Sequence, residues 1–131
     1  MTAFRGSCLC GEVAFEIEGP FDHFLNCHCS RCRKATGSAY AANALVDPEA
    51  LRWLAGSDKI RRYDLPSARS FATAVCSDCG SPVPHATRGG SAVIVPAGSL
   101  DDDPGVGPSH HAHWSSRAAW VTSPCGLPVA E

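Results

Sequence analysis

Positive charge is scarce in this sequence of 131 residues. The 11 lysines and arginines are outnumbered by 13 acidic residues, which gives a formal net charge of −2 at pH 7, and they form no dense stripe. Binding to a nucleic-acid duplex needs clustered positive charge that neutralises the phosphates. We therefore expect no nucleic acid among the partners.

Long apolar runs are missing as well. No window approaches the roughly 20 apolar residues that a membrane-spanning helix needs, and the start of the chain, MTAFRGSCLC, lacks the uninterrupted apolar stretch of a secretory signal. We therefore expect a cytoplasmic protein that does not associate with membranes. In a reducing compartment cysteines remain free thiols that can bind metal, whereas a secreted domain would pair them as disulfides.

Glycine and proline, by contrast, are abundant, with 12 and 10 residues. This composition favours many short strands joined by turns over long helices. The length suits one domain with one hydrophobic core. We therefore predict that residues 1–131 form a single, mainly β domain.

Alternation of apolar and polar residues locates the expected elements. Residues 12–17 alternate as a half-buried strand does, so the first predicted strand follows the first cysteines. Residues 26–37 predict a loop that runs into a short helix, which Gly37 can close. The spacing of the later segments suggests an antiparallel meander. The further predicted strands are 38–46, 51–54, 60–65, 70–75 and 92–96.

The eight cysteines fall into three clusters and one single residue. They are Cys8 and Cys10; Cys27, Cys29 and Cys32; Cys76 and Cys79; and Cys125. Zinc takes about four tetrahedral ligands, and a C-x-x-C step followed by glycine can turn two thiolates toward one metal. Cys76 and Cys79 have this form and need a partner pair. The spacing alone leaves open whether that pair comes from the first cluster or from the middle one.

The middle cluster differs because it brings three thiolates together within one short segment, Cys27-x-Cys29-x-x-Cys32. A tetrahedral zinc held there has one position left, and such open positions are typical of catalytic sites. An incoming thiol bound to zinc would become thiolate near neutral pH, which is the nucleophilic form. The pattern therefore indicates addition of a thiol to an electrophile. The alternatives are a redox C-x-x-C with buried thiols elsewhere, or a single zinc ribbon.

Four motifs in order along the chain carry a resemblance to a known family. They are GSCLCGEVAF at 6–15, NCHCSRCRKATGSAY at 26–40, VCSDCGS at 75–81 and VPAGSLDDDP at 95–104. Together they resemble the glutathione-dependent formaldehyde-activating (GFA) family, which includes centromere protein V. The resemblance spans nearly the whole chain, and it implies a β-tent of small antiparallel sheets stapled by zinc.

The resemblance also implies a role for each cysteine cluster. In that family the first C-x-C joins the late C-x-x-C around a structural zinc, and the C-x-C-x-x-C carries a catalytic zinc whose shell is completed by water or by the thiol of glutathione. The implied structural ligands are Cys8, Cys10, Cys76 and Cys79. The implied catalytic ligands are Cys27, Cys29 and Cys32.

The substrate implied by the resemblance is a small thiol, glutathione. Family members were named for joining glutathione to formaldehyde as S-(hydroxymethyl)glutathione, formally a carbon–sulfur lyase reaction, so two zinc ions are the expected cofactors. Arg33 and Lys34 follow Cys32 directly and are candidate contacts for the glutathione carboxylates, Arg33 through a bidentate pair and Lys34 as a point charge. A solvated turn that balances thiolate charge is the alternative for both residues.

Two function classes remain open on the sequence. One is a zinc-dependent enzyme that activates a small thiol toward formaldehyde or a related electrophile. The other is a non-catalytic zinc module that binds a thiol ligand or a protein partner, and the lack of an obvious general base favours it.

The remaining polar candidates have plainer interpretations. His28, between two cysteines, is expected behind the ligands or at the surface, and His85 is expected as a hydrogen-bonded bystander. Cys125 is expected to be a spare thiol. The histidines of the tail and the run of aspartates are explained by tail packing and by a turn beside a proline. These residues are His110, His111 and His113, and Asp101, Asp102 and Asp103.

Overall fold

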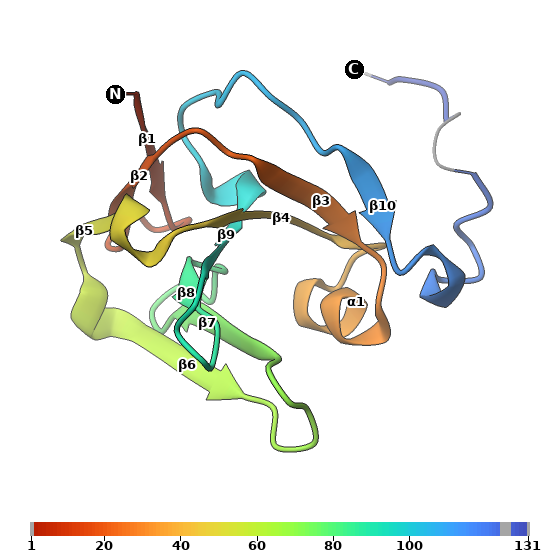
Figure 1. Cartoon of the computed structure of the whole chain (residues 1–131), viewed down its shortest axis with the longest axis horizontal. Coiled ribbons are helices and arrows are strands. Elements are labelled where there is room, and N and C mark those ends of the chain that lie inside the picture. The colour runs from red at the N-terminus through yellow and green to blue at the C-terminus, as the bar shows by residue number, and fades with distance from the viewer. Residues whose placement is uncertain (1, 124–126, 131) are drawn as a thin grey trace.

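The chain folds mainly as β-structure, as predicted. The computed structural model describes residues 2–123 and 127–130, and within them the chain forms ten short strands and one α-helix (Figure 1). The strands belong to three small sheets that make up a single domain. Among the described residues, no helix is long and apolar enough to cross a membrane.

The first sheet has the order β1-β2-β5, with both pairs antiparallel. Its strands are β1 (Ala3–Ser7), β2 (Ala14–Glu18) and β5 (Leu51–Ala55). The alternation that predicted a strand at 12–17 places its apolar residues in the core. Three residues of that alternation are fully buried: Val13, Phe15 and Ile17.

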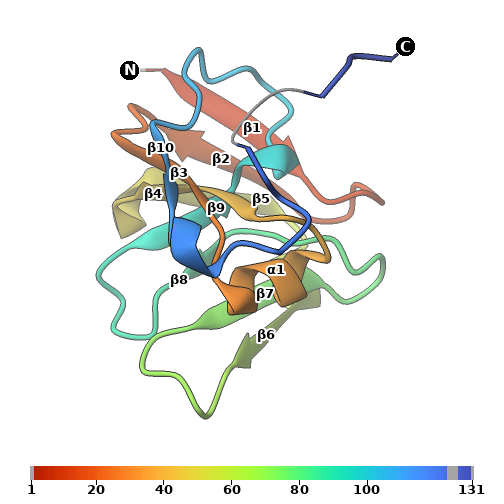
Figure 2. The same ribbon diagram turned by 90° about the vertical axis from the view of Figure 1, so that its right-hand side faces the viewer.

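The second sheet is the largest of the three and has the order β10-β3-β4-β9-β8. Its strands are β10 (His110–Ala112), β3 (His23–Cys27), β4 (Ala41–Val46), β9 (Val93–Pro96) and β8 (His85–Ala86). All pairs in this sheet are antiparallel except β10 with β3, which run parallel at the edge (Figures 1 and 2). Residues 110–112 near the end of the chain are thus built into the sheet.

A third, two-stranded sheet pairs β6 (Ile60–Asp64) with β7 (Ala72–Cys76). The helix α1 (Ser30–Thr36) lies between β3 and β4 and ends at Gly37, whose φ of 64° is the left-handed conformation that favours glycine. Four 3-10 turns complete the described elements: η1 (Pro48–Ala50), η2 (Ser57–Lys59), η3 (Ala97–Ser99) and η4 (Trp114–Ser116).

Two expectations about the strands were wrong. The first strand of the chain, β1, precedes the first cysteines instead of following them. The middle segments do not form a meander, because β5 pairs with β2 and β6 pairs with β7. Gly56, with φ of 74°, turns the chain between β5 and β6, so that these neighbours in sequence enter different sheets.

The hydrophobic core has one main cluster and two satellites. The main cluster lies between the first two sheets and consists of Phe15, Ile17, Phe21, Phe24, Ala44, Val46, Val93 and Val95. Burying a large apolar side chain of this kind contributes roughly 1.5–3 kcal/mol. The two satellites each contain cysteines of one cluster, so the thiols are part of the packing.

Candidate metal centres

Four cysteines from two distant parts of the chain meet at one point. Cys8 and Cys10 lie in the connection from β1 to β2, while Cys76 ends β7 and Cys79 follows it. Their Sγ atoms all lie within 4.8 Å of one another. The spacing had left the partner of the late pair open, and the structure places it beside the first pair. We call this group the four-cysteine cluster.

Each pair sits on a tight turn that ends in a glycine. Gly11 has φ of 82° and its N–H donates to the Cys8 carbonyl at 3.1 Å, and Gly80 has φ of 76° and donates to the Cys76 carbonyl at 2.7 Å. These left-handed conformations are open to glycine at no steric cost. The two turns therefore point both thiols of each pair to the same side.

Hydrogen bonds to sulfur favour the thiolate forms of Cys8 and Cys79. At Cys10 the backbone hydrogen bond with Glu12 is outweighed by desolvation and the neighbouring thiols, which raise the pKa of that thiol instead. The Val13 N–H donates to Cys8 Sγ at 3.3 Å. The side chain and the backbone of Ser81, both hydrogen-bonded with Cys79, lower the pKa of Cys79 to about 5. Because metals bind thiolates, groups that stabilise the anion prepare the site for a cation.

The sulfur distances fit a tetrahedral zinc. Four sulfurs bound at about 2.3 Å to one zinc would lie about 3.8 Å apart. The distance from Cys8 Sγ to Cys10 Sγ is 3.6 Å, and that from Cys10 Sγ to Cys76 Sγ is 3.9 Å. The donor set, its number and its spacing are therefore those of a closed zinc site with four thiolate ligands.

The second group, which we call the three-cysteine cluster, consists of Cys27, Cys29 and Cys32. Cys27 is the last residue of β3, Cys29 caps the N-terminus of α1, and Cys32 lies within that helix. Their Sγ atoms also lie within 4.8 Å of one another. Among the described residues, no further histidine, cysteine or carboxylate joins this group. Three donors on one side leave a tetrahedral ion open on the other.

The three thiols have different environments. Burial raises the pKa of Cys27 and of Cys32. Burial acts in the same direction on Cys29, but the N–H of Cys32, which donates to Cys29 Sγ at 3.3 Å, and the neighbouring thiols lower its pKa below the usual range. The three thiols thus differ in the direction in which their surroundings move the pKa.

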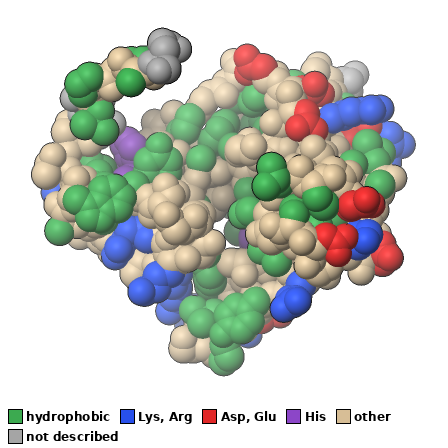
Figure 3. All heavy atoms as spheres, turned by 180° about the vertical axis from the view of Figure 1, so that it is seen from behind, with side chains coloured by type: hydrophobic (Ala, Val, Ile, Leu, Met, Phe, Trp, Pro, Cys, Tyr) green, Lys and Arg blue, Asp and Glu red, His purple; other side chains and the backbone are tan. Residues whose placement is uncertain are grey.

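The basic candidates lie on the same helix. Arg33 and Lys34 belong to α1, where Lys34 is exposed and Arg33 is half-buried. The Nε atom of Arg33 is buried and makes no hydrogen bond within the described part of the chain. In the view of Figure 3, the side of the molecule on which α1 lies shows Lys and Arg side chains and no acidic ones. An anionic group would meet favourable charge there.

A family model described as glutathione-dependent formaldehyde-activating enzyme matches residues 3–116. The chain belongs to this GFA family. A crystal structure of a Rhodobacter sphaeroides protein, solved in a structural genomics programme, is similar to it, with a TM-score of 0.61 and 26% sequence identity over 82% of this chain and 99% of that one. Among proteins with curated descriptions, none matches this chain. Family membership, predicted from the four motifs, is confirmed.

Sequence reasoning missed a ring cluster beside the three cysteines of this GFA protein. Of the two places expected for His28, behind the ligands or at the surface, the structure excludes the surface, because only 1% of the residue is exposed. Its ring contacts those of Tyr40, His111 and Trp114. The density of histidine and tryptophan in the tail predicted packing of the tail, but nothing in the sequence identified the partner.

Other candidates stay outside the two cysteine clusters. His85 lies outside both clusters, as a bystander would, and its two ring nitrogens are buried without a hydrogen bond of good geometry among the described residues. Burial lowers the pKa of His85, and the charge of Arg62 adds to this effect. The carboxylates of Asp101, Asp102 and Asp103 accept hydrogen bonds from Ser7, Arg5 and Gly105. Cys125 lies outside the described residues.

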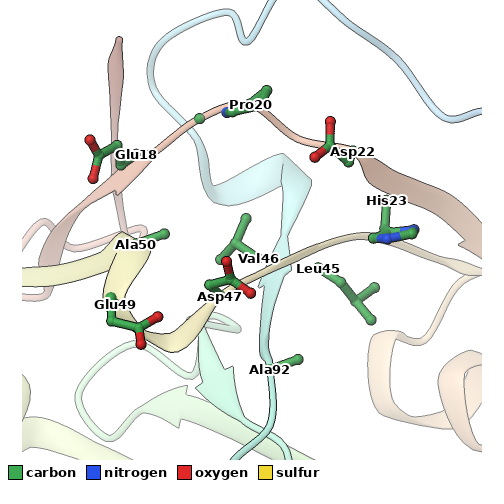
Figure 4. A pocket seen from close by; sticks show the side chains of 11 residues that line it. Glu18, Pro20, Asp22, His23, Leu45, Val46, Asp47, Glu49, Ala50 and Ala92 are labelled. Atoms are coloured by element: carbon green, nitrogen blue, oxygen red, sulfur yellow. The ribbon is translucent and has the colours of Figure 1, made fainter. Parts of the chain in front are cut away.

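A cavity of about 520 Å³ lies at the end of the β3–β4 pair that is farther from the three-cysteine cluster (Figure 4). Its lining includes His23 and Val46, whereas Cys27 pairs with Ala41 at the opposite end of these strands. His23 and Cys27 lie four residue steps apart along β3, which is about 13 Å. We therefore place the candidate chemistry at the cysteines and not in this cavity, whose lining includes four acidic residues, Glu18, Asp22, Asp47 and Glu49.

Proposed function

We propose that the chain is a zinc-dependent enzyme that activates a small thiol, glutathione, for addition to formaldehyde or a related electrophile. In this proposal Cys27, Cys29 and Cys32 hold a zinc ion whose remaining position accepts the thiol. The observation that carries the proposal is the contrast in donor number, since one cluster offers four sulfurs and the other three. Membership of the GFA family supports the choice of thiol.

The four-cysteine cluster takes the structural role in the proposal. Cys8, Cys10, Cys76 and Cys79 would bind a second zinc with no position free for a substrate. Two of these residues, Cys8 and Cys76, are buried in a satellite of the core with Val13, Ala74 and Val83. An ion held there would join the start of the chain to β7.

The proposed chemistry is a thiol addition. Zinc, when bound, lowers the pKa of a coordinated thiol, so that the nucleophilic thiolate exists near neutral pH. The thiol sulfur forms a bond to the carbonyl carbon, the carbonyl π-bond opens, and the oxygen takes up the proton that the thiol releases. The product is an S-hydroxymethyl thiol, and the reverse direction is the cleavage of a carbon–sulfur bond.

The chain's own residues would supply binding and orientation. Arg33 and Lys34 are proposed to pair with the glutathione carboxylates, since they lie on α1, the helix that also carries Cys32. Cys29 accepts the Cys32 N–H and so holds the loop and the helix start together.

The alternative is a non-catalytic zinc module that binds a thiol ligand or a protein partner. The position of the 520 Å³ cavity favours it, because that cavity lies at the far end of β3 and β4 from the three cysteines. Direct binding of glutathione without turnover of formaldehyde would support this alternative. Both versions require thiols that stay reduced, as they do in the cytosol.

Calorimetric titration with glutathione in buffers of different ionisation heat tests the proposal. Binding should release protons near neutral pH, because zinc stabilises thiolate over thiol. The matched variant Cys32→Ser should lose this heat while keeping the zinc of the four-cysteine cluster. Protein shown to hold two zinc ions that gives no heat with millimolar glutathione would rule out glutathione as the substrate.

A further inference from the structure

The ring of His28 occupies an unusual place, between two cysteines of the three-cysteine cluster and yet fully buried. Ring centroids of Tyr40 and Trp114 lie 5.0 Å from that of His28, and the centroid of His111 lies at 4.9 Å. His28 Nε2 and His111 Nδ1 are 2.8 Å apart, which is hydrogen-bond distance. The ring is therefore held on several sides by groups from distant parts of the chain.

The partner ring comes from β10, which runs parallel to β3 at the edge of the sheet (Figure 2). Ala112 pairs with Cys27, and the His28 N–H donates to the Ala112 carbonyl at 2.9 Å. The loop at residues 27–29 is thus tied to β10 twice, once through the backbone and once through the His28 side chain.

A second set of contacts fixes Trp114 within the ring cluster. The guanidinium of Arg117 lies 4.5 Å from the centre of the Trp114 ring, and its N–H groups donate to the carbonyls of Trp114 and Val121. Trp114 is therefore clamped beside His28. Cation–π contacts of this kind contribute about 0.5–2 kcal/mol.

The orphaned nitrogen of His28 indicates the direction of the hydrogen bond. Its Nδ1 is buried and has no partner among the described residues. An unpaired buried acceptor costs less than an unpaired N–H donor, so the proton belongs on Nε2. His28 then donates to Nδ1 of His111, and His111 serves as the acceptor.

We propose that His28 and His111 are positioning residues that hold Cys27 and Cys29 in the geometry needed to bind metal. The inference rests on the proposed function, because it takes the three-cysteine cluster as a zinc site. Cys27 and Cys29 are the two neighbours of His28 in sequence, so fixing this ring fixes the backbone on both sides of it. A loop held in the binding conformation loses less entropy when the ion is bound.

This role differs from that of an ordinary core contact in what it affects. A purely structural contact would stabilise the whole domain and would therefore affect both metal positions through unfolding. A positioning contact affects the three-cysteine cluster alone, because the four-cysteine cluster is built by other elements, the β1–β2 turn and the end of β7.

Three variants of the zinc-loaded protein test the inference. His111→Ala removes the acceptor, and His111→Asn keeps a carbonyl oxygen near the place of Nδ1. His110→Ala is the matched control, since His110 is the exposed neighbour of His111 on the same strand. Among the described residues, its side chain forms a hydrogen bond with Ser109 and none with the ring cluster. Zinc transfer to a coloured chelator measures the affinity of each site without any thiol substrate.

The inference predicts that His111→Ala lowers the zinc affinity of the three-cysteine cluster at least about tenfold, as loss of outer contacts to a metal site does. The zinc affinity of the four-cysteine cluster should stay at the wild-type value. His111→Asn should recover most of the lost affinity, and His110→Ala should behave as wild type. The inference would be overturned by an equal loss of zinc affinity at both clusters, by an unchanged affinity at the three-cysteine cluster, or by a lack of recovery in His111→Asn. Failure of glutathione to bind would overturn the proposed function and leave these affinities unaffected.

Discussion

The two cysteine clusters differ in how the chain assembles them. In the four-cysteine cluster, Cys10 meets Cys76 across 66 positions of sequence. In the three-cysteine cluster all three thiols come from one short segment, the end of β3, the residue that caps α1 and the first turn of α1. Closing a long loop costs more conformational entropy than closing a short one, so an ion that joins distant segments stabilises the fold more than one bound within a loop.

The clusters also differ in what surrounds them. The four-cysteine cluster is self-contained, with two glycine turns that place its thiols and hydrogen bonds that link its sulfurs to Val13 and Ser81. The three-cysteine cluster depends on β10 and its rings for support. The comparison supports the two proposed roles, in which the four-cysteine cluster stabilises the fold and the three-cysteine cluster carries the chemistry.

The largest expected effect is on stability. Cys79→Ser should prevent folding, because structural zinc contributes about 10–16 kcal/mol of apparent binding free energy in small domains, as much as the about 5–15 kcal/mol that stabilises a whole domain. Cys32→Ser should remain folded. Thermal melting followed by circular dichroism distinguishes the two. Equal melting temperatures for both variants and the wild type would remove the distinction between the clusters.

The next effect is on metal content. Reduced wild-type protein should carry close to two zinc ions per chain, and Cys32→Ser close to one, because the variant leaves two thiols in the smaller cluster. Plasma mass spectrometry measures both values. A wild-type value near one would mean that the three-cysteine cluster does not hold zinc under these conditions, contrary to the proposal.

A smaller effect is expected on thiol selectivity. Arg33→Ala should weaken glutathione binding about tenfold, since a hydrogen bond to a charged group contributes about 1.5–3 kcal/mol, and it should leave binding of 2-mercaptoethanol, which has no carboxylate, unchanged. Arg31→Ala removes the same charge from an exposed position of α1 and serves as control. Equal weakening of both thiols would show that Arg33 acts on the site as a whole.

The smallest effect is on the turn glycines. Gly80→Ala should destabilise the domain by about 1–2 kcal/mol, the cost of a left-handed conformation for a residue with a β-carbon. No steric clash adds to this cost, because the added carbon would meet no atom within 4 Å. Gly89→Ala, where φ is not left-handed and space is also open, is the control. Denaturant unfolding measures both. A loss in the control as large as in Gly80→Ala would argue against strain at the turn.

Much of this organisation could be predicted from the sequence because it is local. The alternation at 12–17 marks β2, and the short apolar segments mark β4, β5, β6, β7 and β9 within a few residues. The cysteine spacings separate the two clusters, although the partner of Cys76 and Cys79 required the family resemblance. Glycine after each of the outer pairs marks the turns that the structure contains.

What the sequence did not reveal involves buried polar residues and distant pairing. β3 was missed because Asn26 at its end is polar, yet only 9% of its surface is exposed. His28, which follows β3, was expected behind the ligands or at the surface because it lies between two cysteines, and the structure buries it. β10 pairs in parallel with β3, and no local pattern specifies a partner so far away in sequence. The support of the three-cysteine cluster therefore emerged only from the structure.

Cobalt substitution tests the contrast between a closed and an open site most directly, because the visible spectrum of Co²⁺ changes with its sulfur ligands. The account predicts that the reduced protein takes up two Co²⁺ ions and that glutathione then alters the absorption of one of them. Cys32→Ser should bind one ion whose spectrum glutathione leaves unchanged. A protein with both ions bound and no spectral change at millimolar glutathione, or one in which both ions respond, would contradict the account.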